Sequence, residues 1–107
     1  MVYIQIQWTT DSIDEAKKIA KELVKKKWVA CANILPYVDS YYLWDGKMQE
    51  NREVKVFFKT KDENFPRVRD YIIAHASYEI PEVSKIPITD ANPDYINWLY
   101  ENLAEES

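Results

Sequence analysis

The sequence is poor in glycine, cysteine and histidine, and each shortage excludes a kind of site. With one glycine in 107 residues, the chain has neither a G-x-G-x-x-G dinucleotide loop nor a Walker phosphate loop. A single cysteine excludes an internal disulfide, which suits a reducing compartment. With a single histidine as well, we find no dense metal-ligand motif and no Ser-His-Asp or Cys-His catalytic set. We therefore expect a protein that is not an enzyme.

A surplus of positive charge and long apolar runs are also missing. The formal net charge is −4, and without a basic surplus a broad attraction for phosphates is absent, so we expect no nucleic-acid partner. No window contains the roughly 18 uninterrupted apolar residues that a membrane span needs. The start, "MVYIQIQWTT", has no basic segment followed by an apolar run. We expect no membrane association and a cytoplasmic location.

What the sequence does contain is a regular succession of strand and helix patterns over a single domain, residues 1–107. Residues 2–8 alternate apolar and polar side chains as a half-buried strand does. A helix is predicted over about 12–27, because Ser12 and Glu15 form a capping-box pattern and acids precede lysines along it. The later predicted elements are a helix beginning around 63 to 66, a short edge strand in "EVSKI" and a last helix opened by Asn92-Pro93.

A hairpin is predicted around "YYLWDGKMQ", residues 41–49, which holds the only glycine. Asp-Gly favours the type I′ turn that joins two antiparallel strands, here residues 28–44 and 47–61. The turn sets Asp39 opposite Arg52, and a bulge near Pro36 is expected because the same register would otherwise pair alanines with lysines. The order of elements predicts an α+β fold, the ferredoxin-like split βαβ arrangement with a long extended β-hairpin and a C-terminal helix.

This hairpin is too long for a domain of this size. Arms of about 15 residues span roughly 50 Å, whereas a typical strand has roughly 5 to 6 residues. The part that overhangs is rich in aromatic side chains: Tyr37, Tyr41, Tyr42, Leu43 and Trp44. Such an exposed apolar edge aggregates unless another chain covers it. We therefore expect a homo-oligomer that assembles through the hairpin strands.

Two residues could carry metal chemistry, and each has a plainer interpretation. His75, followed in "AHASYEIPE" by Glu79 and Glu82, could bind a divalent metal such as copper or zinc. At the end of a helix it could equally contact free backbone carbonyls, and the sparse ligand spacing favours this second interpretation. Cys31 in "VACANI" is predicted to be a small buried apolar side chain, with soft-metal or redox chemistry as the alternative.

Several motifs together resemble the CutA divalent-cation-tolerance family along nearly the whole chain. The family pattern A-C-x-N-I is similar to residues 30–34, and S-x-Y-x-W-x-G-K is similar to residues 40–47. Glu53 followed by Lys59-Thr60 matches the next strand, and Y-x-x-W-L matches residues 95–99. The family commonly has H-P-Y-x-x-P-E where this chain has Ala76 in place of the histidine, with His75 one position earlier. One position at a helix end turns a side chain by about 100°.

The resemblance implies a homotrimer whose long hairpins pair with neighbouring subunits, similar to the PII signalling proteins. It implies a function in tolerance of divalent cations, with Cu²⁺ as the possible cofactor. It also implies a ligand cleft between subunits, near Tyr42, Trp44, Lys59, Tyr78 and Glu79. The candidate metal ligands are His75, from the residue pattern above, and Glu79 and Cys31, which match family positions. Two alternatives remain: a PII-like sensor of a small anionic metabolite, and a trimeric scaffold without a ligand.

Overall fold

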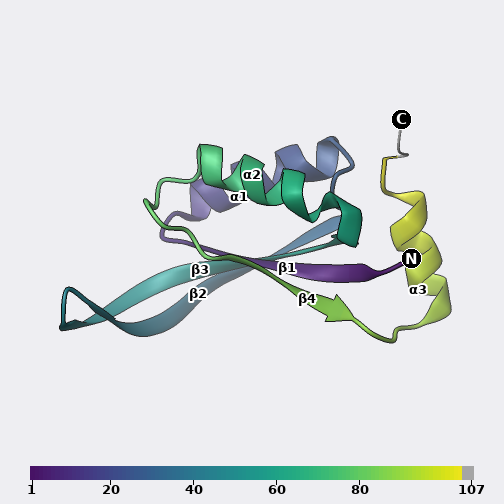
Figure 1. Ribbon diagram of the computed structural model, residues 1–107. Coiled ribbons are helices and arrows are strands. Elements are labelled where there is room, and N and C mark those ends of the chain that lie inside the picture. The colour runs from purple at the N-terminus through teal and green to yellow at the C-terminus, as the bar shows by residue number, and fades with distance from the viewer. Residues whose placement is uncertain (105–107) are drawn as a thin grey trace.

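The computed structural model describes residues 1–104 as one sheet and three helices (Figure 1). The last three residues of the predicted domain, 105–107, lie outside the described part. The elements in chain order are β1 (Tyr3–Thr10), α1 (Ile13–Lys25), β2 (Cys31–Trp44), β3 (Lys47–Lys61), a 3-10 turn (Asp62–Asn64), α2 (Phe65–His75), β4 (Val83–Ile88) and α3 (Pro93–Glu101). Among residues 1–104, every helix falls short of the length and apolar character that a membrane-spanning helix requires.

The sheet has the strand order β2-β3-β1-β4, and every neighbouring pair is antiparallel. Figure 1 shows α1 and α2 side by side over one face of the sheet, and α3 at the end where the chain begins. β4 lies at an edge, as expected of a strand that contains Pro87, which has no N–H to donate. The predicted α+β class and the predicted order of elements are confirmed.

The core lies between the sheet and the two helices that cover it. Alternate residues of β1, namely Ile4, Ile6 and Trp8, are buried against the helices, as the period of two predicts. Opposite them on β3 lie Thr60, Phe58 and Val56. The intervening residues of both strands therefore face the other side of the sheet, which α1 and α2 leave open.

The hairpin has the predicted register in its outer half. Trp44 lies opposite Lys47 and Asp39 opposite Arg52, and both turn residues, Asp45 and Gly46, have positive φ of 53° and 75°. The predicted bulge is confirmed, because the register shifts between Leu35 and Val38. Two residues of β2 there face one residue of β3, which is the arrangement of a bulge.

The second strand begins at Cys31, three residues later than predicted. α1 ends in a Schellman motif: Lys27 has a φ of 59°, its N–H donates to the Val24 carbonyl, and the Trp28 N–H donates to the Leu23 carbonyl. The Trp28 carbonyl then accepts side-chain hydrogen bonds from Thr60 and Asn64. These contacts occupy the backbone that the longer strand would have used.

The overhang predicted for the hairpin is present. β1 ends at Thr10 opposite Val54, so within residues 1–104 the part of β3 from 47 to 53 pairs with β2 alone. Figure 1 shows this part extending beyond the helices. More than half of each of five large side chains is exposed there: Tyr37, Tyr41, Leu43, Trp44 and Met48.

Candidate binding site at the root of the hairpin

A cavity of about 550 Å³ lies where the hairpin leaves the sheet. Three segments far apart in the sequence form its walls: β1, the hairpin, and the loop of residues 76–82 between α2 and β4. The lining side chains are Thr9, Ser40, Tyr42, Trp44, Gln49, Glu53, Lys55, Tyr78, Glu79, Ile80 and Glu82.

The bulge in β2 determines which side chains of the hairpin face this cavity. Below the bulge, Leu35 lies opposite Lys55, so odd-numbered residues of β2 share the open face of the sheet. The bulge absorbs one residue, and beyond it Val38 lies opposite Glu53. Even-numbered residues therefore take over that face. This change places Tyr42 and Trp44 in the cavity wall.

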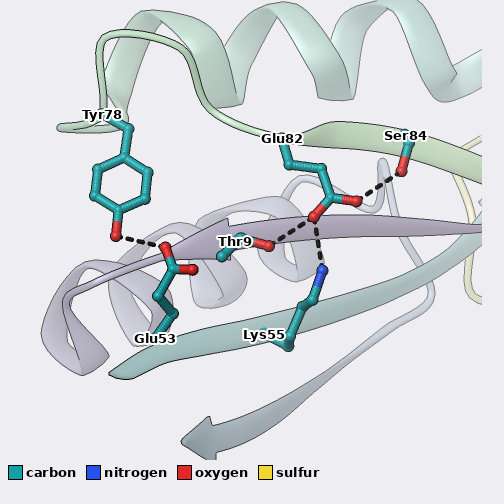
Figure 2. Close-up of polar contacts among 6 residues, drawn as sticks. All are labelled: Thr9, Glu53, Lys55, Tyr78, Glu82 and Ser84. Carbon is teal, nitrogen blue, oxygen red and sulfur yellow. Dashed lines mark hydrogen bonds and ion pairs between the residues drawn. The ribbon is translucent and has the colours of Figure 1, made fainter. Parts of the chain in front are cut away.

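The floor of the cavity holds a buried carboxylate. Glu53 is 6% exposed, and its Oε2 accepts a hydrogen bond of 2.7 Å from the Tyr78 hydroxyl (Figure 2). Burial of the Tyr78 side chain, followed by the hydrogen bond to Glu53, raises the pKa of the phenol above its usual value. Tyr78 is therefore a lasting hydrogen-bond donor at neutral pH. Among residues 1–104 it is the only hydrogen-bond partner of the Glu53 carboxylate.

The second carboxylate in Figure 2, Glu82, is fully engaged with its neighbours. It accepts hydrogen bonds from Thr9 Oγ1 at 2.7 Å, Lys55 Nζ at 2.6 Å and Ser84 Oγ at 3.2 Å. Its burial alone would raise the pKa of Glu82, but the hydrogen bonds from Lys55 and Thr9 outweigh burial and lower it. The charge of Lys55 is thus already paired, which leaves the cavity with a negative excess.

The loop that carries Tyr78 is fixed to the start of α1. Ser12 caps that helix by accepting a hydrogen bond of 3.1 Å from the Glu15 N–H, as the capping pattern predicts. The carboxylate of Glu15 does not complete the box, however. It accepts hydrogen bonds from Thr10 Oγ1 at 2.5 Å and from the Ser77 N–H at 2.9 Å. Glu15 therefore positions the residue next to Tyr78.

The structure brings together four of the five residues predicted for the ligand cleft. Tyr42, Trp44, Tyr78 and Glu79 line the cavity. Lys59 lies elsewhere on the sheet, opposite Cys31, and its Nζ donates to Asn33 Oδ1 at 2.9 Å. The sequence motif at 59–60 does not show how far Lys59 lies from the cavity, because that distance depends on strand register.

The three residues predicted as metal ligands are not assembled by the single chain. His75 contacts the Tyr71 carbonyl through Nδ1 at 2.8 Å, which is the plainer of its two interpretations. Cys31 Sγ lies 3.8 Å from the Tyr95 hydroxyl, whose pKa burial raises to about 12. Within residues 1–104 there is no group of three His, Cys, Asp or Glu side chains that could hold a metal ion. Residues 1–104 of one protomer therefore do not form a metal centre by themselves.

The remaining lining residues were not predicted as site residues. Glu53 was noted as part of a motif and Glu82 as a neighbour of His75, whereas Thr9 and Lys55 were not singled out. The signal for Lys55 and Glu53 is their alternation with Val54 and Val56, which assigns both to one strand face. No local signal places Thr9 beside Glu82, because 73 positions separate them.

The fold and the cavity define a class: a small α+β protein with an acidic and aromatic cavity at the root of an overhanging hairpin. The family described as CutA1 divalent ion tolerance protein matches residues 4–102. The chain belongs to this family, and the resemblance seen in the sequence is confirmed.

Individual relatives agree in sequence and in fold. The chain is 37% identical over 94 residues to the divalent-cation tolerance protein CutA of Thermus thermophilus, which covers 88% of this chain and 91% of that protein. It matches the crystal structure of CutA1 from Oryza sativa with a TM-score of 0.94 at 29% identity, over 99% of this chain and 97% of that one. Protein CutA of Mus musculus is 35% identical over 80% of this chain, which spans 49% of that relative.

Proposed function

We propose that this chain forms a ferredoxin-like homotrimer, not an enzyme, that binds a small ligand in the cavity at the hairpin root. Through this binding it takes part in tolerance of divalent cations, copper first among them. Glu53 is the observation that carries the proposal: a carboxylate 6% exposed on the floor of a cavity of about 550 Å³. We place the protein in the cytoplasm, because its single thiol suits a reducing compartment.

A buried carboxylate is costly unless hydrogen bonds or an opposite charge compensate for its lost hydration. An ionised carboxylate can accept about four hydrogen bonds, and Tyr78 supplies one. A ligand in the cavity would supply the others. The unmet hydrogen-bonding capacity of Glu53 therefore favours a bound ligand in this cavity.

Assembly follows from the overhang. The exposed aromatic and aliphatic side chains of the hairpin would be covered by neighbouring copies, and the outer edge of β3 over residues 47–53 offers unpaired backbone groups for strand pairing. Tyr42 and Trp44, which line the cavity, belong to this overhang. A neighbouring copy would therefore close the cavity and turn it into a cleft between subunits.

Copper at this cleft would need ligands beyond those of one protomer. Glu79 is the exposed carboxylate of the cavity wall without a partner among residues 1–104, and further oxygen ligands would have to come from another copy. Calorimetric titration of CuCl2 into the purified protein tests this. The matched variants are Glu79→Gln in the cavity and His75→Ala outside it.

We expect Glu79→Gln to weaken copper binding at least tenfold and His75→Ala to leave it unchanged. If His75→Ala weakens copper binding and Glu79→Gln does not, the metal binds at the end of α2, which would contradict a copper site in the cavity. If the parent binds neither copper nor any small molecule in a thermal-shift screen, the ligand-free scaffold replaces this proposal. A response to small anions alone would favour the PII-like sensor.

A further inference from the structure

We infer that the ligand of this cavity is a small organic cation, an alkylammonium with N–H donors. Its ammonium group lies at Glu53 and Glu79, and its carbon chain lies against Tyr42, Trp44 and Ile80. The inference rests on the proposed binding function and names the chemical class of the ligand.

Charge is the first reason. Four charged side chains line the cavity: Glu53, Lys55, Glu79 and Glu82. Lys55 and Glu82 form an ion pair of 2.6 Å and cancel each other, so two carboxylates remain without a cation. Asp11 adds to the same field, since it is among the charges that raise the pKa of Tyr78. Because a partly enclosed site strengthens such a field, a cation is attracted and an anion is repelled.

The hydrogen-bonding capacity of Glu53 is the second reason. Its Oε2 is held by Tyr78, while Oε1 has no partner among residues 1–104. The Lys55 ammonium, which also lines the cavity, is engaged by Glu82 and makes no hydrogen bond to Glu53. A protonated amine provides both the charge and the N–H donors that this oxygen lacks. A cation without N–H groups would meet only the first need.

The aromatic walls are the third reason. Tyr42, Trp44 and Tyr78 all line the cavity, and aromatic faces attract organic cations and also pack against their methylene groups. The Tyr42 hydroxyl accepts a hydrogen bond from Asn51 Nδ2, which fixes the ring from outside. Walls of this kind suit a molecule with a carbon body.

The size and ligand chemistry of the cavity separate this ligand from a bare metal ion. A volume of about 550 Å³ is that of a small-molecule pocket. A divalent ion needs several converging ligands, and the described residues hold no group of three candidates. An alkylammonium needs one or two carboxylates and an apolar wall, and the cavity has both.

The test is a calorimetric titration of the intact protein with five probes: 1,4-diaminobutane, tetramethylammonium, 1,4-butanediol, CuCl2 and inorganic phosphate. We expect the diamine to bind at least tenfold more tightly than tetramethylammonium, which lacks N–H donors, and the neutral diol not to bind. Glu53→Gln should weaken diamine binding at least tenfold, because glutamine still accepts the Tyr78 hydrogen bond but carries no charge. Trp44→Leu, an exposed position, removes the aromatic wall and should weaken it as well.

Lys59→Gln is the matched control for Glu53→Gln, since Lys59 lies on β3 as Glu53 does but outside the cavity. It should bind the diamine as the parent does. Equal affinity for diamine and diol, or diamine binding unchanged in Glu53→Gln, overturns the inference. If copper or inorganic phosphate binds in a Glu53-dependent manner while the diamine does not, the ligand class is wrong and the proposed binding function stands. If no probe binds, the binding function itself is contradicted.

Discussion

At the scale of single residues, the structure makes Glu53 dependent on one hydroxyl group. Replacing Tyr78 with phenylalanine removes the only donor that this buried carboxylate has within residues 1–104. We expect Tyr78→Phe to lower the free energy of unfolding by about 1 to 3 kcal/mol, the cost of a buried acceptor left unsatisfied. Urea unfolding at neutral pH measures it. Tyr100→Phe, which alters an exposed tyrosine of α3, should change stability little.

The same pair predicts a pH dependence. The pKa of Tyr78 is raised in the folded state, so the protonated phenol contributes stability that is complete below the unfolded pKa of about 10. This contribution is lost as the pH rises through the higher folded pKa. The difference between parent and Tyr78→Phe should therefore be constant from neutral pH to about pH 9 and shrink above about pH 10. A difference that grows in alkali would contradict the assigned hydrogen bond.

Glu82 behaves in the opposite sense. Its pKa is lowered in the folded state, so its contribution is present above the unfolded pKa of about 4.3 and is lost as the pH falls through the folded pKa. Glu82→Gln should destabilise by less than about 1 kcal/mol at neutral pH, because the ion pair with Lys55 is partly exposed to water. In acid, where Glu82 is protonated, the two proteins should unfold at the same urea concentration.

The family resemblance predicted part of the cavity lining. It implied Tyr42, Trp44, Tyr78 and Glu79 as cleft residues, and the structure gathers them in one cavity. The contacts of Glu82 with Thr9 and Lys55 join three elements, and periodicity carries no information on which loop covers which strand end. Lys59 lies outside this cavity of one chain, and its place in a cleft between subunits stays a prediction. Alternation identifies its face, whereas only the tertiary fold gives its position along that face.

At the scale of elements, the end of α1 carries backbone strain that was not predicted from the sequence. Lys27 occupies the left-handed position of a Schellman motif, where glycine is usual. Lys27→Gly should raise the free energy of unfolding by about 0.5 to 1 kcal/mol, since the relief of a left-handed non-glycine residue exceeds the added entropy of the unfolded chain. Lys26→Gly, at a helical φ of −71°, should destabilise instead. Thermal unfolding of the two variants distinguishes the relief of backbone strain at Lys27 from the general effect of introducing a glycine.

The hairpin turn is the element that the sequence specified best. Asp45-Gly46 predicted the turn and the register beyond it, and Pro36 predicted the bulge that restores alanine to an apolar partner, Phe58. At Gly46 an added Cβ would meet no atom within 4 Å, but the φ is +75°. Gly46→Ala should therefore cost about 1 kcal/mol of stability from backbone conformation alone. Gly46→Asn should cost less, because asparagine tolerates this region; equal costs would point to a different origin.

At the scale of the whole molecule, the overhanging hairpin also exposes apolar side chains on the side opposite the cavity. Leu43 lies opposite Met48, and the two are 66% and 68% exposed. They alternate with Tyr42, Trp44 and Gln49, which line the cavity, so they point away from it. Substitutions at this pair can therefore test assembly without altering the cavity wall.

We predict that the parent sediments at three times its chain mass of 12.7 kDa. Leu43→Glu with Met48→Lys keeps an attractive cross-strand pair but places charges on the surface that a neighbouring copy would cover, so this variant should sediment as a monomer. Far-UV circular dichroism should show the same sheet content in both proteins. Ile73→Glu, at another exposed apolar position, on α2, is the matched control and should remain a trimer. A parent that stays monomeric at high concentration would contradict the assembly and leave the cavity open on the side where we place the neighbouring copy. A double variant that stays trimeric would show that Leu43 and Met48 do not lie in the contact between copies.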